Sequence, residues 1–295
     1  MSRYGVIDVG SNTIHLLVGE VEGGKVMPIT GEKVSARLGY GVDETGRLDE
    51  ERLVLGAETI ALFARISALN GAPSPTILAT SAVRDSENGP EFVERVREST
   101  GLKMRLISGE EEALLGFRGA LSASKTLSDA PVLVVDLGGG SAQIIVGEAS
   151  NGPLMQVSLP LGSNRTTEKF VKSDPAKKKE LKALDKHVKE MMPGWSTSAR
   201  VQVVAVGGSA RAMVKIAGEP LNIDRLRELA TEVSERSSGV LAREEGLAPE
   251  RARVMPAAIT TFAAILEHFG KDELTVARGG IREGTLLTLA EGEEI

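Results

Sequence analysis

The chain has 295 residues, of which 41% are hydrophobic and 26% charged, and its 35 basic and 41 acidic side chains give a formal net charge of −6. Its length favours two domains over one, and its acidic balance argues against general nucleic-acid binding. It contains no cysteine, which excludes disulfides, thiolate catalysis and cysteine-ligated zinc.

The N-terminal residues Met1–Tyr4 lead directly into an apolar strand pattern, without the features of a signal segment. No apolar stretch reaches the length of a transmembrane helix. We therefore expect a cytoplasmic protein without a membrane partner. Aromatic residues make up 3% of the chain, so the cores are expected to consist of Leu, Val, Ile and Ala.

The first third of the sequence predicts a hairpin sheet followed by α/β units, because apolar residues recur first with strand spacing and then with helix spacing. Ser108 and Glu111 match a capping box at the start of a further helix. The other predicted elements are a helix over Asp49–Asn70, a strand over 76–80, a loop over Ser81–Asp85, a helix from Asn88 to Arg97 and a strand over 102–107.

The polar stretch 122–130 is the best candidate for a domain boundary, since a second hairpin and further α/β units follow it. Asp174-Pro175 is predicted to cap a lysine-rich helix, whose Lys177-Lys178-Lys179 run is interpreted as a solvated face. The other predicted elements are strands over Leu154–Leu159, Val201–Val206 and Leu274–Ala277, a helix after Pro160–Arg165, a helix ending at Ala217, long helices near Asp224–Arg243 and Pro249–Phe269, and a terminal helix.

Two segments repeat one arrangement of residues. In each, an apolar strand ends at an aspartate and is followed by a Gly/Ser turn and a second apolar run: Asp8 precedes Gly10–Thr13, and Asp136 precedes Gly138–Ser141. Such turns also occur as ordinary hairpin connections. However, consecutive backbone N–H groups in a turn bind anions, and an aspartate can hold a cation beside them. The pair predicts phosphoryl chemistry in a cleft between two related domains.

Two further places carry groups that suit this chemistry. Arg84 follows a buried strand, where a guanidinium is held rigidly enough to bind phosphate, and a surface ion pair with Asp85 is the alternative. Glu110, Glu111 and Glu112 share one helical turn. At least one of them serves the helix dipole. One or two can face a site, as a metal ligand or as a base that orients water.

A third glycine turn, Gly207-Gly208-Ser209, follows a buried strand. It is either a turn that binds a phosphate chain or nucleotide, or a helix start with Ser209 as the N-cap, and both roles are compatible. The histidines His15, His187 and His268 have no metal-ligating partner at useful spacing, so we interpret them as structural.

Together these motifs resemble those of the exopolyphosphatase and guanosine pentaphosphate phosphohydrolase (Ppx/GppA) family, which has the sugar-kinase/Hsp70/actin-like fold. The resemblance runs from Tyr4 to about Leu287. Without the C-terminal extension of long family members, the sequence is expected to have the short two-domain form. His15 stands where many relatives carry arginine, and in this it resembles the short actinobacterial-type exopolyphosphatases. The resemblance rests on five motifs in this order: Asp8–Thr13, Ala79–Asp85, Ile107–Ala113, Asp136–Ser141 and Gly279–Gly284.

The resemblance implies an α/β fold of two duplicated actin-like (ribonuclease H-like) domains with an interdomain cleft. The first domain is expected over residues 1–124, joined by a C-terminal helix at 281–295, and the second over residues 125–280. The implied cofactor is Mg²⁺ or Mn²⁺, the implied reaction is hydrolysis of a terminal phosphoanhydride, and a homodimer is the oligomeric state that the resemblance suggests.

The resemblance also assigns roles to individual residues. Glu112 would orient the attacking water, and Arg84 would contact phosphate. Asp8 and Asp136 would lie near the metal ion. The phosphate-binding turns would consist of Ser11, Asn12, Thr13, Gly138, Gly139, Gly140 and Ser141.

Position 143 departs from the family pattern. Family members carry Gly-Gly-Gly-Ser-x-Glu, in which the glutamate serves in catalysis or metal binding, whereas this chain has Gln143. Glutamine can orient a water or a ligand, but it neither accepts a proton nor lends charge to a metal. Gln143 stays a candidate catalytic residue. Glu112 can suffice as the base, since phosphoryl transfer depends mainly on positioning and electrostatics.

The predicted function is that of an exopolyphosphatase acting on inorganic polyphosphate. One alternative is a guanosine pentaphosphate 5′-phosphohydrolase of the stringent response, which would need a purine pocket, for instance near 207–210. The other is a weakly active or inactive sensor that binds polyphosphate or guanosine penta- or tetraphosphate, which Gln143 favours. Nucleic acid is not an expected partner.

Overall fold

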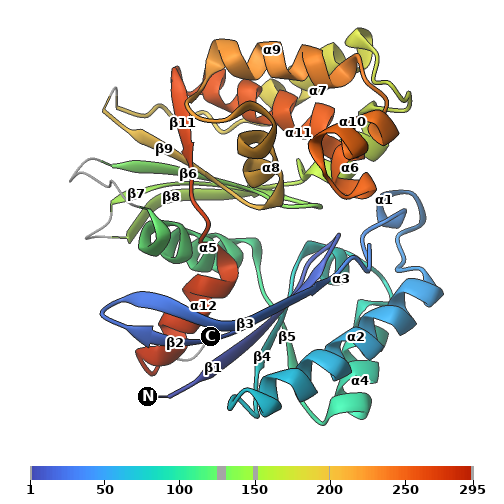
Figure 1. The fold of residues 1–295 in the computed structure, drawn as a ribbon, viewed down its shortest axis with the longest axis vertical. Helices are drawn as coiled ribbons and strands as arrows, with labels where there is room; N and C mark the ends of the chain where they lie inside the picture. The colour runs from blue at the N-terminus through green and yellow to red at the C-terminus, as the bar shows by residue number, and fades with distance from the viewer. Residues whose placement is uncertain (1, 125–130, 149–151, 199, 294–295) are drawn as a thin grey trace. The chain divides into compact units, whose positions relative to one another are not determined.

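The computed structural model describes residues 2–124, 131–148, 152–198 and 200–293. The chain divides into two compact units, residues 1–124 with 279–295 and residues 125–278. Figure 1 shows one β-sheet and its own helices in each unit. Residues 125–130 of the predicted boundary lie outside the described part. Within that part, no helix combines the length and apolar character of a membrane span.

The sheet of the first unit has five strands among the described residues. They are β1 (Tyr4–Val9), β2 (Ile14–Glu22), β3 (Lys25–Val34), β4 (Thr76–Ala79) and β5 (Met104–Leu106). Their order is β3-β2-β1-β4-β5. The first three strands are antiparallel neighbours, and β4 and β5 continue the sheet parallel to β1.

The sheet of the second unit repeats this pattern. Its strands in the described residues are β6 (Val132–Leu137), β7 (Ala142–Glu148), β8 (Gly152–Leu159), β9 (Gln202–Val206), β10 (Leu221–Asn222) and β11 (Glu273–Val276). In the order β10-β11-β9-β6-β7-β8, the last three strands are antiparallel, and β9 and β11 extend parallel to β6. The predicted duplicated α/β fold is therefore confirmed.

Helices cover both faces of the first sheet (Figure 1). The helices of this unit are α1 (Val42–Thr45), α2 (Glu50–Leu69), α3 (Ser81–Arg84), α4 (Gly89–Thr100), α5 (Gly109–Ala123) and α12 (Ile281–Ala290). Because side chains alternate along a strand, Ile7 of β1 packs in the core that holds Leu53 of α2. Val6 packs in the core that holds Leu115 of α5 and Leu286 of α12.

In the second unit one helix, α11 (Pro249–His268), is buried along most of its length. Figure 1 shows the other helices of the unit beside it. These helices are α6 (Ser163–Phe170), α7 (Lys178–Met191), α8 (Gly208–Ala217), α9 (Ile223–Ser234) and α10 (Ser238–Glu245). The core consists of apolar side chains from α11, these helices and one face of the sheet.

The structure corrects two sequence predictions in this unit. The helix predicted over Asp224–Arg243 is two helices, because the chain leaves the helical path after α9 and Ser237 caps α10 by accepting a hydrogen bond from the Val240 N–H. Asp174 does not cap the lysine-rich helix, since its carboxylate accepts bonds from the N–H and hydroxyl of Ser238 instead.

One correction concerns the first unit. The segment predicted as a loop after β4 begins with the single helical turn α3, in which the Arg84 and Asp85 N–H groups donate to Thr80 and Ser81. The predicted capping box is confirmed, because Ser108 and Glu111 exchange side-chain and backbone bonds at 3.1 and 2.7 Å.

Candidate active site

The turn after β1 is held by hydrogen bonds on its carbonyl side. The Gly10 N–H donates to the Thr13 carbonyl at 3.2 Å. The Ser11 carbonyl accepts from the Gly39 N–H at 2.8 Å, and the Asn12 carbonyl accepts from the Arg37 N–H at 2.9 Å. The Ser11 hydroxyl also bonds the Ser81 hydroxyl of α3 at 3.0 Å. This turn is thereby tied to the short helix that carries Arg84.

The turn after β6 has the same internal bond, from the Gly138 N–H to the Ser141 carbonyl at 3.0 Å. Its Gly138 and Gly139 carbonyls accept N–H bonds from the start of α6, and a Cβ at Gly162 would lie 2.3 Å from the Gly139 oxygen. Within the described residues, the Gly139 and Gly140 N–H groups take no part in these bonds. They suit the binding of an anion.

The two candidate metal ligands occupy equivalent places in the two sheets. Asp8 lies opposite His15 across β1 and β2, and Asp136 lies opposite Gln143 across β6 and β7. Both aspartates are half-buried. A Cβ at Gly207, whose φ is +100°, would lie 3.2 Å from Asp136 Oδ1. The structure therefore brings the third glycine turn against Asp136.

Arg84 and Glu112 meet, although 27 residues separate them in the chain. Arg84 Nη1 donates to the Ile107 carbonyl at 2.8 Å and lies 3.6 Å from Glu112 Oε2, while Nε lies 3.3 Å from Asp85. The side chains are 28% and 13% exposed. Because a guanidinium has five donors, Arg84 keeps donors for a phosphate beside the Glu112 carboxylate.

The structure separates the roles of the three glutamates. Glu111 closes the capping box, and the bond from the Ser108 N–H is the main cause that lowers the pKa of its carboxyl. Glu110 is exposed. Glu112 is the member of the triplet that lies beside Arg84.

Gln143 lies inside the second unit. Its side chain is 1% exposed, and its amide donates to the hydroxyls of Ser141 and Ser158 at 2.8 and 3.1 Å. The amide thus links the glycine turn to β8. This geometry suits a residue that positions the turn.

Ser209 does not cap α8, since the N-cap residue is Gly207 and no side chain bonds there. The Ser209 hydroxyl instead accepts from Arg251 Nη1 of α11 at 2.8 Å, and a Cβ at Gly208 would lie 2.5 Å from Arg251 Nη2. Burial, and then the charge of Arg211, lowers the pKa of Arg251. Sequence analysis missed Arg251, because its position on a mostly buried helix gives no local signal.

His15 has a partner that its local sequence does not indicate. Its Nδ1 lies 3.2 Å from Arg282 Nη1 at the start of α12. Because arginine only donates, Nδ1 is the acceptor in this bond. Arg282 belongs to Gly279–Gly284, the last of the five motifs. Membership of that motif is the sequence feature that could have pointed to Arg282.

Asp8 and Asp136 suit Mg²⁺ in their chemistry. Mg²⁺ prefers oxygen ligands and is usually bound by one or two carboxylates together with substrate phosphates and waters. Across residues 2–124, 131–148, 152–198 and 200–293, no group of three or more His, Asp or Glu side chains could hold a metal. Either aspartate by itself would leave most coordination positions of Mg²⁺ to phosphate and water oxygens.

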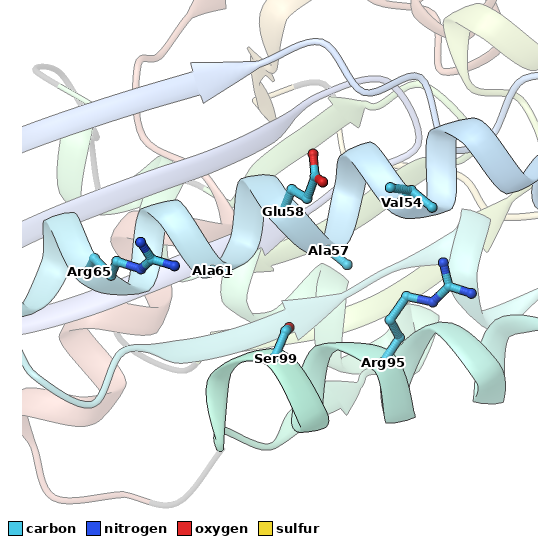
Figure 2. Close-up of a pocket in the computed structure, with 7 residues that line it drawn as sticks. All are labelled: Val54, Ala57, Glu58, Ala61, Arg65, Arg95 and Ser99. Carbon is cyan, nitrogen blue, oxygen red and sulfur yellow. The ribbon is translucent and has the colours of Figure 1, made fainter.

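A pocket of about 350 Å³ lies between α2 and α4 (Figure 2). Figure 2 shows Arg65 and Arg95 at its two ends with Ser99 between them. None of the predicted site residues lines it. The lining residues are Val54, Ala57, Glu58, Ala61, Arg65, Arg95 and Ser99.

Comparison with known proteins agrees with these motifs. The model of the Ppx/GppA phosphatase family matches residues 17–293. Exopolyphosphatase 1 of Mycobacterium tuberculosis is 29% identical over an alignment of 308 residues, which covers 99% of this chain and 89% of that protein.

Solved structures show the same fold. The Aquifex aeolicus Ppx/GppA family member is 27% identical with a TM-score of 0.82, covering 100% of this chain and 99% of that one. An exopolyphosphatase from Cytophaga hutchinsonii is 23% identical with a TM-score of 0.90, covering 99% of both chains. Because the family model spans nearly the whole sequence, this chain belongs to the Ppx/GppA phosphatase family.

Proposed function

We propose that this protein is an exopolyphosphatase that removes the terminal phosphate of inorganic polyphosphate, with Mg²⁺, in the cytoplasm. The observation that carries the proposal is the Glu112 carboxylate 3.6 Å from the Arg84 guanidinium, which is itself held by a hydrogen bond to the Ile107 carbonyl in the first unit. The relatives named exopolyphosphatase support the substrate class. Guanosine pentaphosphate as a substrate and the homodimer stay predictions.

In this reaction, water attacks the terminal phosphorus and the bond to the bridging oxygen breaks. Glu112 would orient the water and accept its proton, and Arg84 would donate to an oxygen of the transferred phosphoryl group. The Gly139 and Gly140 N–H groups would bind phosphate oxygens. The protein contributes mainly position and charge, which suits the loose transition state of phosphoryl transfer.

Asp8 and Asp136 would hold the metal ion. When bound, Mg²⁺ would neutralise charge on the phosphate oxygens and on the leaving group. The equivalent places of the two aspartates at strand ends beside anion-binding turns support this assignment.

The test is orthophosphate release by the purified protein with Mg²⁺, on long-chain polyphosphate, guanosine pentaphosphate and ATP in parallel. Glu112→Gln is expected to lower kcat by about 10²–10⁴-fold. Glu110→Gln is the matched control, because it removes the same charge from the same turn at an exposed position. It should leave kcat within about twofold of wild type. Equal effects of both changes would contradict the role of Glu112.

A second candidate function is a sensor that binds polyphosphate or guanosine penta- or tetraphosphate with little turnover. The buried amide of Gln143, opposite Asp136, favours it, since an amide supplies no negative charge there. Gln143→Glu separates the two functions. A kcat much larger in Gln143→Glu than in wild type would indicate that the wild-type active site is weakened. A wild-type protein that is already active, with no gain in the variant, would support the exopolyphosphatase.

A further inference from the structure

A short stretch of the second unit concentrates positive charge. Residues 169–189 hold eight of the chain's 14 lysines and three acidic residues, although acidic side chains outnumber basic ones, 41 to 35, over the whole chain. Six exposed lysines of this stretch form what we call the lysine patch. They are Lys172, Lys177, Lys178, Lys179, Lys182 and Lys186.

The acidic residues of the stretch are engaged elsewhere. Glu180 accepts bonds from the backbone N–H groups of residues 172, 173 and 177, Asp174 bonds Ser238, and Asp185 pairs with Arg227 and Lys189. Within the described residues, Lys186 is the only patch member in an ion pair, with exposed Glu190 at 3.6 Å. The patch therefore presents positive charge that its neighbours leave largely uncompensated.

The backbone gathers these lysines in one place. The Lys172 and Lys177 N–H groups donate to the same Glu180 carboxylate at 3.2 and 2.8 Å, so both side chains emerge at the start of α7. Lys178, Lys182 and Lys186 follow at intervals of four residues on one face of that helix, about 6 Å apart along its axis. The opposite face is buried in the core.

One helix leads from the glycine turn to the patch. The N-terminus of α6 bonds the Gly138 and Gly139 carbonyls, and its C-terminus at Phe170 lies two residues before Lys172. Eight helical residues span about 12 Å. Arg165 and Lys169 lie one turn apart on the same side of α6. Positive groups thus continue from the turn to the patch within one unit.

We propose that the lysine patch binds the body of the polyphosphate chain while its end occupies the active site; this rests on the proposed function. Lysine ammonium groups on flexible stems suit a polyanion that presents the same phosphate at every position. Binding at the patch and at the active site would be linked through one substrate molecule. Long chains would therefore bind more tightly than chains that cannot span both.

The test compares K178Q/K179Q/K182Q with the control K25Q/K33Q/K103Q, which removes three exposed lysines from the first unit. Equilibrium binding of long-chain polyphosphate, tripolyphosphate and single-stranded RNA is measured at several salt concentrations, together with orthophosphate release. The binding arm does not depend on turnover. If the wild-type protein binds polyphosphate without releasing phosphate, the proposed exopolyphosphatase function is refuted. The binding measurements on the two variants would still test the lysine patch.

The patch variant is expected to bind long-chain polyphosphate about tenfold or more weakly, with a higher KM and unchanged kcat. The plot of log affinity against log salt concentration should become less steep, its slope shrinking in magnitude by about 2. This value takes each lost lysine–phosphate contact to contribute as it does on a single-stranded nucleic acid. Tripolyphosphate binding and the control variant should match wild type. Unchanged long-chain binding, an equal loss in the control, or a loss confined to RNA would overturn the proposal.

Discussion

Gly284→Ala is expected to force α12 away from α5, the helix whose first turn carries Glu112. A Cβ at Gly284 would lie 1.9 Å from the carbonyl oxygen of Leu115 and 2.7 Å from its carbonyl carbon. Ordinary contact of a Cβ with another heavy atom begins near 3.4 Å. The helices would therefore have to separate by about 1.5 Å, which is the difference between this contact distance and the 1.9 Å to the Leu115 oxygen. Both obstructing atoms belong to the backbone, so no side-chain rotation relieves the overlap.

The expected cost follows from this geometry. Overpacking a close-packed interior costs typically 1–3 kcal/mol and more where the neighbour is rigid, and separation also loosens the packing of buried Leu286. The helix preference for Ala over Gly returns about 1 kcal/mol. The loosened packing and the helix preference act in opposite directions, so we expect the free energy of unfolding to fall by about 1–3 kcal/mol, which lowers Tm by roughly 2–12 °C.

The assay is urea denaturation together with kcat on polyphosphate. A displacement of about 1 Å near reacting groups can cost about 10²-fold in rate, so kcat should fall as well. Gly239→Ala in α10 is the control, since no atom lies within 4 Å of its added Cβ, and it should gain about 0.5–1 kcal/mol. A Gly284→Ala protein as stable as wild type would refute the close backbone contact, and so would a control that loses equally.

Three further changes test the site. Arg84→Lys keeps the charge but loses the planar fork of donors, so kcat/KM on polyphosphate should fall by about 10–100-fold, and an unchanged value would argue against phosphate binding there. Glu111→Gln keeps an acceptor for the Ser108 N–H but removes the negative charge, and it should cost about 0.3–1 kcal/mol at neutral pH. The folded protein lowers the pKa of Glu111 below 4.5. The difference in the free energy of unfolding between wild type and this variant should therefore shrink as pH falls through the folded pKa. Urea titrations in which that difference stays constant with pH would contradict the role of the Glu111 charge. Gln143→Leu leaves two serine hydroxyls without their amide partner and should lower the urea midpoint by the equivalent of about 1–3 kcal/mol; an unchanged midpoint would show that the hydroxyls find other partners.

Sequence analysis identified features that depend on neighbouring residues. These features follow from the spacing of apolar residues and from the residues that cap helices, both of which act over a few residues. They include the two strand–turn–strand segments, the helix from Asp49 and the capping box at Ser108. The duplicated α/β fold followed from the repeat of these local patterns together with the resemblance. The break after α9 was missed, because the helical pattern of apolar residues continues across it and only the Ser237 cap marks the new start.

The tertiary structure decided which distant groups meet. The helical pattern alone does not distinguish Glu112 from Glu110, and Glu112 was singled out only by its place in the Ile107–Ala113 motif. Its contact with Arg84 exists because Ile107, just before α5, bonds the end of β4 and also accepts a hydrogen bond from Arg84. Likewise, Asp174 pairs with a serine 64 residues away, and Ser209 with Arg251 at a separation of 42. Apolar periods and caps are local properties of the chain, whereas these contacts exist only after the sheets and helices have packed, so the sequence by itself determined the elements and packing decided the site.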